Sequence, residues 1–300
     1  MFWSIDKKGQ PVLDRTHTYA QAFSIYGLSA YYRTSGNENA LVLARQLFEL
    51  IEKYTFDAVN GGNIECLARD WSQLDDMRLS TVDLNSQKSM NTMLHLMEAY
   101  SALFTAWPDE VLKQKLSGIM GDFINNIIDP VTGHQRLFFD NTWKSLTDHV
   151  SYGHDIETSW LLLEAANTLG DPDLITQSKS LSVKMAQAVH DRALGKDGSI
   201  LYESGPNGYQ VMERQWWAHA EAVVGFYNAF QVSDQPHFQE ASFRAWDYIQ
   251  KYFIDRVNGD WYKLLREDNT PVLTHNNVGP WECPYHHARM CLEMIERLQD

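Results

Sequence analysis

The sequence is poor in cysteine, in positive charge and in long apolar runs, and each shortage excludes a class of protein. Its three cysteines, Cys66, Cys283 and Cys291, offer no close disulfide framework, which favours a reduced, cytoplasmic protein. Lysine and arginine number 25 against 39 aspartates and glutamates, so the net charge of −14 would be repelled by nucleic acids and anionic membrane surfaces. No apolar run approaches the ~20 residues that span a bilayer, and residues 1–10 lack the apolar core of a signal peptide.

The sequence also lacks the short motifs of several enzyme classes. No G-x-S-x-G, P-loop, dinucleotide glycine fingerprint or H-E-x-x-H pattern is present. Cys283-x-x-His286 has the spacing of metal ligands, but no second half-site follows it. We therefore expect no metal and no cofactor, and activity that survives chelation. Four further histidines are expected to be structural or exposed: His17, His219, His275 and His287.

Aromatic side chains and a repeated turn pattern are what the sequence has in plenty. Trp, Tyr and Phe make up 12% of the chain; most would fill a core, but a Trp face at the mouth of a cavity suits the C–H face of a sugar ring. An Asp-x-x-x-Gly pattern recurs about every 65 residues, a unit that cannot bury its apolar face alone. The repeats therefore indicate a closed array with a shared centre. The four copies are Asp57–Gly61, Asp129–Gly133, Asp191–Gly195 and Asp255–Gly259.

Hydrophobic periodicity predicts nine helices in one all-α domain over residues 1–300, with short β-hairpins between helix pairs. The first helix of each pair is more apolar and carries Trp, Tyr and His near its start, whereas the second is amphipathic, as expected for an inner and an outer ring. Six such pairs form an (α/α)6 toroid. The predicted helices span 17–36 with 38–55, 87–106 with 109–127, 154–169 with 171–189, 214–231 with 235–253, and 284–298.

The repeat length also predicts the size of the complete array. Six units of about 65 residues come to about 390, so we expect roughly 90 to 100 residues upstream of Met1 in the complete form. The expected fold is therefore an incomplete toroid with about nine of twelve helices. Such a chain would be a monomer or would pair with another copy through its open side, and it would be less stable and less active than an upstream-extended form.

Histidines near the starts of the predicted inner helices are the candidate catalytic groups. His154 is followed three residues later by Glu157 on the same helix face. His286 holds the corresponding position of the last helix, and His95 lies within two turns of the start of another. Imidazole, with an ordinary pKa of about 6.5, takes and gives protons near neutrality. Three histidines directed at one centre therefore favour general acid–base chemistry.

Two other functions remain open from the residues alone. Glu157 and Glu221 could form the carboxylate pair of an (α/α)6 glycoside hydrolase, although histidines at both key positions disfavour it. Alternatively, the chain could be an inactive sugar-binding remnant. Hydrolysis would release monosaccharides, and a remnant would bind without turnover, so a product assay separates these functions.

Four segments of the sequence together resemble the N-acylglucosamine 2-epimerase superfamily, and G-H-D-I-E with S-W plus C-P-Y-H favours its cellobiose 2-epimerase branch. The resemblance implies cofactor-independent epimerisation at C2 of the reducing-end glucose of a β-1,4-disaccharide such as cellobiose, lactose or mannobiose. A cis-enediol(ate) forms when one histidine removes the C2 proton and another returns it. The segments are K-S-M-N-T-M-L-H-L-M-E-A-Y (88–100), S-Y-G-H-D-I-E-T-S-W-L-L (151–162), R-Q-W-W-A-H-A-E-A (214–222) and G-P-W-E-C-P-Y-H-H-A-R-M (279–290).

The resemblance also implies a role for individual residues. His154 and His286 match the two bases, and His95 matches the histidine that assists ring opening. Glu157 would orient His154 or hold a hydroxyl group. The remaining matches are contacts to sugar: Tyr19, Asn91, the stacking residues Trp217 and Trp281, and Ser80 and Asp83 for the non-reducing sugar.

The chain departs from the superfamily pattern at two places. Met93 stands where the family usually has a histidine, in N-T-M-L-H rather than N-T-H-L-H. The family also carries a functional arginine on its first inner helix, and no position of this sequence matches it.

Overall fold

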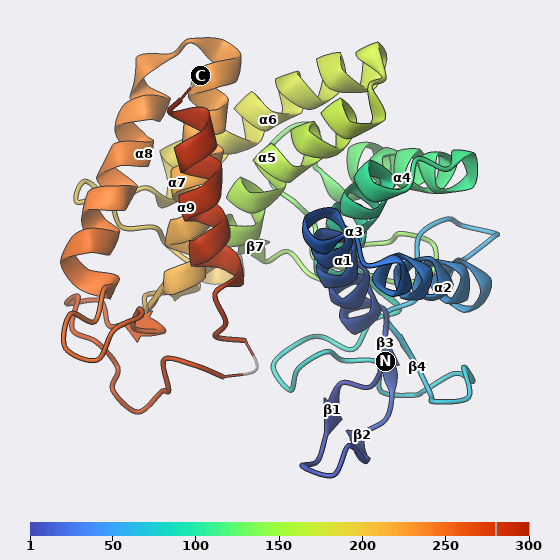
Figure 1. The fold of residues 1–300 in the computed structure, drawn as a ribbon. Coiled ribbons are helices and arrows are strands. Elements are labelled where there is room, and N and C mark those ends of the chain that lie inside the picture. Colours follow the sequence, from blue (N-terminus) through green and yellow to red (C-terminus); the bar gives the residue numbers. More distant parts are fainter. Residues whose placement is uncertain (280, 300) are drawn as a thin grey trace. The chain divides into compact units, whose positions relative to one another are not determined.

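The chain folds into helices joined by short strands in a computed structural model that describes residues 1–279 and 281–299 (Figure 1). Nine α-helices lie within these residues, and each predicted helix is present to within a few residues. The helices are α1 Thr18–Ser35, α2 Glu38–Tyr54, α3 Met90–Ala106, α4 Glu110–Asp122, α5 Tyr152–Leu169, α6 Pro172–Ala193, α7 Trp216–Ser233, α8 Pro236–Tyr248 and α9 Tyr285–Arg297. A π-helical turn extends α4 over Phe123–Ile127, and another extends α8 over Ile249–Phe253.

Short antiparallel strands tie the start of each helix pair to the segment that follows it. The pairs β3–β4, β5–β6, β7–β8 and β10–β11 each enclose two helices, while β1–β2 is a local hairpin and β9 adds to β8. The strands thus pair across a helix pair, rather than only in hairpins between pairs. They are β1 Ser4–Ile5, β2 Pro11–Leu13, β3 Thr16–His17, β4 Cys66–Leu67, β5 Lys88–Ser89, β6 Phe138–Phe139, β7 Val150–Ser151, β8 Glu203–Ser204, β9 Gln210–Val211, β10 Arg214–Gln215 and β11 Leu264–Leu265.

Local sequence signals explain where several helices begin and end. Asn37 and Asp109 cap α2 and α4, each side chain accepting hydrogen bonds from backbone N–H groups two and three residues on. Ser89 caps α3 by accepting from the Thr92 N–H. Helix α1 stops at Gly36, whose left-handed φ of 68° costs glycine little.

The repeated Asp-x-x-x-Gly pattern forms a turn at three of its copies, over residues 58–60, 130–132 and 256–258. In Asp57–Gly61 and Asp255–Gly259 the glycine N–H donates to the aspartate carbonyl at 2.9 Å. The predicted turn at Asp191–Gly195 is wrong, because α6 continues through the buried Ala193 and Asp191 is helical. The turn forms four residues later, where the Gly198 N–H donates to the Gly195 carbonyl at 3.1 Å.

The described residues divide into two compact units, each with its own core. The N-terminal unit comprises residues 1–129, 136–148 and 164–172, and the C-terminal unit comprises 130–135, 149–163 and 173–299. In the first, the largely buried α3 packs against α1 and α4. In the second, the largely buried α7 packs against α8 and α9, drawn in orange and red in Figure 1. The single-domain expectation stays a prediction.

No helix among the described residues has the length and apolar character needed to cross a membrane.

Candidate functional site

Two histidines and a tryptophan come together at the starts of three helices in the C-terminal unit. His154 lies in the first turn of α5, Trp217 in that of α7 and His286 in that of α9. The Trp217 ring centroid is 4.7 Å from that of His154 and 5.2 Å from that of His286. One indole thus contacts both predicted bases, so the two imidazoles lie close to the same aromatic ring.

A glycine makes room for that indole. A side-chain carbon on Gly153 would lie 2.7 Å from the Trp217 ring and 2.9 Å from Ala218. Gly153 directly precedes His154, so the same turn of α5 presents the imidazole and admits the tryptophan. His154 also contacts the strand before its helix: its Nδ1 lies 2.7 Å from the hydroxyl group of Ser151, at the end of β7.

His286 is backed by a buried carboxylate. Its Nδ1 lies 2.7 Å from Glu221 Oε1 and 3.9 Å from Glu157 Oε1. Burial would raise the pKa of Glu221, but the charge of Arg289 and the His286 hydrogen bond outweigh it and hold that pKa well below its usual range. An ionised carboxylate only accepts, so Nδ1 of His286 donates, and in the neutral imidazole the lone pair is on Nε2.

Arg289 joins the two buried glutamates of this site. Its Nη2 donates to Glu157 Oε1 at 2.8 Å and to Glu221 Oε1 at 2.7 Å. The second oxygen of Glu221 accepts from the Trp160 indole N–H at 3.0 Å. Glu157 therefore contacts the Arg289–His286 pair. Its expected role, to orient His154 or to hold a sugar hydroxyl, stays a prediction.

The N-terminal unit holds the third predicted histidine. His95 lies 4% exposed on α3, with Nδ1 3.1 Å from Glu98 Oε2. Its ring contacts Tyr19, at 5.1 Å between centroids, and Phe23 at 4.7 Å, both on α1. Asn91 lies one turn before His95, and its buried Oδ1 has no hydrogen-bond partner. Aromatic rings suit the C–H groups of a sugar, and neighbouring polar side chains suit its hydroxyl groups, so this arrangement is compatible with sugar binding.

The residues predicted to contact the non-reducing sugar lie in loops. Ser80 and Asp83, between β4 and β5, bond to each other: the Ser80 N–H donates to Asp83 Oδ2 at 2.8 Å, and the Asp83 N–H donates to the Ser80 carbonyl at 3.3 Å. Trp281, between β11 and α9, is 39% exposed. Their contacts to sugar stay predictions.

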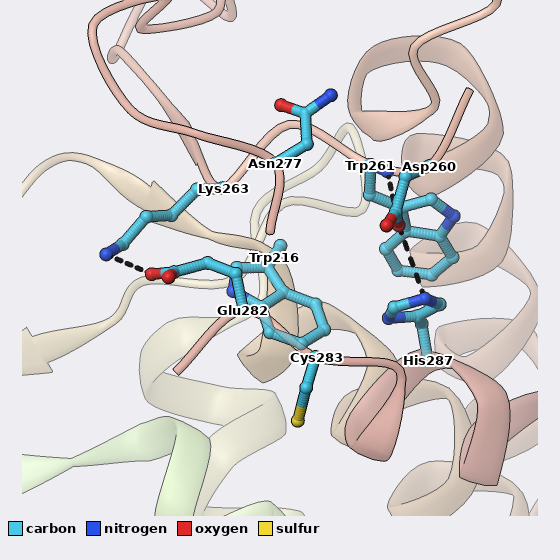
Figure 2. A pocket seen from close by; sticks show the side chains of 8 residues that line it. All are labelled: Trp216, Asp260, Trp261, Lys263, Asn277, Glu282, Cys283 and His287. Carbon is cyan, nitrogen blue, oxygen red and sulfur yellow. Dashed lines mark hydrogen bonds and ion pairs between the residues drawn. The ribbon is translucent and has the colours of Figure 1, made fainter. Parts of the chain in front are cut away.

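A small pocket in the C-terminal unit, lined by Trp216, Cys283 and His287 among others, has room for about one water molecule (Figure 2). The Lys263–Glu282 ion pair lies on one side, and on the other His287 Nε2 lies 3.3 Å from Asp260 Oδ1. The Trp216 ring contacts His287 at 5.3 Å and His286 at 5.4 Å. The pocket is too small for a sugar.

Three of the four histidines that were expected to be structural or exposed differ in their burial. His219 is buried, accepts from the Ile200 N–H and donates to the Gln215 carbonyl. Burial lowers the pKa of His219 to about 3. His17 is buried and His275 is exposed.

One cluster offers the atoms of a metal site. Glu157, Glu221 and His286 each place a ligand atom within 4.8 Å of the other two, an oxygen and nitrogen set that divalent cations accept. The Arg289 guanidinium already donates to both carboxylates, so a positive group occupies the space between them. The expectation of a metal-independent enzyme stays a prediction.

Sequence reasoning missed Arg289 and Trp160, and it considered Glu221 only as a hydrolase carboxylate. The signal for Arg289 was its spacing, three residues after His286 on the same helix face. Glu221 likewise follows Trp217 by four residues. Nothing in either spacing identifies the partner on another helix.

Comparisons with known proteins agree with this geometry. The model of the N-acylglucosamine 2-epimerase (GlcNAc 2-epimerase) family matches residues 1–290. The chain is 40% identical to the cellobiose 2-epimerase of Bacteroides fragilis over 296 residues, 98% of this chain and 75% of that protein. Its identity to the cellobiose 2-epimerase of Ruminococcus albus is 42% over 298 residues, 99% of this chain and 76% of that protein.

Solved structures show the same likeness. A sugar epimerase from a ruminal bacterium matches with a TM-score of 0.94 and 41% identity, covering 99% of this chain and 76% of that one. Cellobiose 2-epimerase from Bacillus thermoamylovorans matches with a TM-score of 0.93 and 40% identity, with the same coverage. These likenesses confirm the predicted all-α fold class of the (α/α)6 type. With the family match over residues 1–290, they show that the chain belongs to the N-acylglucosamine 2-epimerase family and is an isomerase of the epimerase type.

Proposed function

We propose that the chain interconverts the reducing-end glucose and mannose of β-1,4-disaccharides, as in the conversion of cellobiose to glucosyl-mannose. The observation that carries the proposal is the contact of both His154 and His286 with the Trp217 ring. The indole face would hold the C–H face of the sugar. The two imidazoles in contact with that ring would reach C2 of the bound sugar, one from each face.

The two histidines differ in a way that suits opposite proton transfers. Because ionised Glu221 accepts from Nδ1 of His286, the neutral form of this imidazole would carry its lone pair on Nε2 and could remove a proton from the sugar. Ser151, beside His154 Nδ1, can donate or accept, so it supports His154 in either protonation state. Reversal of the two roles gives the reverse epimerisation.

The reaction would proceed through an enediolate. After the ring opens, one histidine removes the C2 proton and leaves a cis-enediol(ate). Rotation about C2–C3 presents the other face, and the second histidine returns a proton there. We propose that His95 assists ring opening and that Asn91 and Tyr19 contact the substrate.

Glycoside hydrolysis is the less favoured function for Glu157 and Glu221. A hydrolase needs one protonated carboxyl group as its general acid. Here one guanidinium nitrogen bonds both carboxylates, and the pKa of Glu221 is lowered rather than raised. Glu221 is therefore held as an anion that supports His286.

Incubation with cellobiose in D2O tests the two-base scheme. The expected product is glucosyl-mannose with deuterium at C2, detected by NMR and mass spectrometry. His154→Asn and His286→Asn should each lower kcat by about 10² or more, the scale of general acid–base catalysis. His275→Asn, at an exposed position, is the matched control. Epimer without solvent deuterium would exclude exchange through two bases, and release of glucose would instead support the hydrolase.

A further inference from the structure

We propose that Arg289 is a positioning residue that supplies the site's fixed positive charge, in the space where Glu157, Glu221 and His286 would otherwise bind a divalent cation. The inference rests on the proposed function for its catalytic consequence. Its structural part, the substitution of a guanidinium for a metal, can be tested without any sugar.

The contacts of Arg289 hold its guanidinium group in place. The side chain is 8% exposed although it carries a full charge. Its guanidinium lies over the Tyr285 ring at 4.2 Å and the Trp160 ring at 4.8 Å. A buried arginine that is stacked and bonded in this way cannot swing away to solvent, so its charge is a fixed part of the site.

Two buried carboxylates depend on that charge. Glu157 and Glu221 are both less than 2% exposed, and each places Oε1 on the same Arg289 nitrogen. Two adjacent buried anions with no cation between them would repel each other strongly. The arginine therefore fixes the position of Glu221, and Glu221 in turn fixes the ring orientation of His286.

The same atoms would bind a metal if the guanidinium were absent. Two carboxylate oxygens and one imidazole nitrogen, within 4.8 Å of one another, form a three-ligand set of the kind found in open metal sites. Arg289 donates hydrogen bonds to both carboxylate oxygens. Its charge therefore repels a metal cation, and its N–H groups take up the oxygens that the cation would bind. Removal of the guanidinium alone should leave both the ligands and the space.

Arg289→Ala in the full chain is the test, with Arg297→Ala as its matched control. Arg297 lies two turns further along α9, and its guanidinium is 5.9 Å from the same Trp160 ring, but it bonds Glu293, Asn228 and Gln231 instead. The two variants thus remove the same group from the same helix. They differ in whether the group bridges Glu157 and Glu221.

The first measurement is titration with CoCl2, followed by visible absorption. Arg289→Ala should bind Co²⁺ at least roughly tenfold more tightly than the unaltered chain or Arg297→Ala. His286→Asn added to Arg289→Ala should weaken that binding. Equal Co²⁺ affinity in all of these proteins would overturn the proposal.

The second measurement is epimerase activity with guanidinium chloride added at non-denaturing concentrations. Arg289→Ala should lose about 10²-fold in kcat and regain part of it with guanidinium, whereas methylammonium, a point charge, should restore less. Arg297→Ala should keep its rate and not respond. A folded Arg289→Ala protein that turns over normally would overturn the positioning role.

A second variant covers the case in which Arg289→Ala does not fold. If Arg289→Ala does not fold, Arg289→Met keeps most of the apolar volume over Trp160, and the same two measurements apply. Because the Co²⁺ titration needs no turnover, a failed deuterium-exchange experiment would reject the proposed function while leaving the cation-site result intact.

Discussion

Glu65 carries a wholly buried carboxyl group in the N-terminal unit. Ser89 Oγ and Thr92 Oγ1 donate to its two oxygens at 2.7 and 2.8 Å. Burial raises the pKa of Glu65 from 4.5 to about 7, although the two hydroxyl donors lower it in part. Since the folded state disfavours the anion, this residue's contribution to stability is most favourable below pH 4.5 and is lost as the pH rises towards 7.

Glu65→Gln should therefore change how stability depends on pH. Glutamine keeps an acceptor and a donor between the two hydroxyls but carries no charge. Relative to the unaltered chain, the free energy of unfolding of the variant should rise between pH 5 and pH 8 by on the order of 1–3 kcal/mol. Urea unfolding at both pH values measures it, and Glu38→Gln, at an exposed position, is the control. Parallel pH dependences for both proteins would show that Glu65 is not the titrating group.

Among single residues, those at the starts of helices could be predicted from the sequence. The buried residues that bond to them from other helices could not. His154, Trp217 and His286 follow recognisable helix-start patterns, and the structure brings all three together. Arg289 was missed because its partner Glu157 is 132 positions away and on another helix. A pairing across that distance is created by the fold and leaves no local pattern.

Helices α5 and α7 approach each other closely at one glycine. A side-chain carbon on Gly225 would lie 2.6 Å from the backbone oxygen of Ile156 and 2.6 Å from its side chain. Backbone atoms cannot move aside as a flexible side chain can. The absence of a side chain at this position therefore sets the separation of the two helices that carry His154 and Trp217.

Gly225→Ala should separate these helices and destabilise the chain by about 1–3 kcal/mol, the cost of overpacking a core. Gly118→Ala is the matched control, because Gly118 is exposed within α4 and an added carbon there meets nothing within 4 Å. That change should stabilise the chain by about 0.5–1 kcal/mol. Thermal unfolding of both variants gives the comparison, and a loss of stability in both would assign the effect to the helix backbone rather than to the contact.

At the scale of elements, helix number and order were predictable because apolar spacing and capping residues are local. The strand pairing was not, since β3 and β4 are separated by two helices, as are β5 and β6. The turn predicted at Asp191 failed for a related reason. The burial of Ala193 against the core extends α6 past a residue that elsewhere begins a turn.

The charge of the whole molecule acts against its own compactness. With a net charge of −14 and an isoelectric point of about 5.2, the folded chain concentrates like charges that the unfolded chain spreads apart. Salt screens this repulsion over a distance of about 10 Å at 0.1 M. Electrostatic self-repulsion should therefore be relieved as the salt concentration rises.

Thermal unfolding at pH 8 should show Tm rising when NaCl is increased from about 10 to about 200 mM. The same salt series near pH 5.2, where the net charge approaches zero, is the control and should give a smaller rise. A Tm that falls with salt at pH 8 would mean that specific ion pairs, such as those of Arg289, outweigh the overall repulsion.

The short strands that enclose each helix pair have a consequence for how such enzymes diverge. They fasten loops at their ends: the loop of residues 68–87 runs from β4 to β5, and residues 266–284 run from β11 to α9. Ser80, Asp83 and Trp281 lie in these loops, whereas His154 and His286 lie on helices. Lengthening a fastened loop costs only about 0.6 kcal/mol per doubling. Such loops tolerate insertions and deletions. If the proposed function holds, substrate preference can therefore change in the loops while the proposed proton-transfer residues stay in place on the helices.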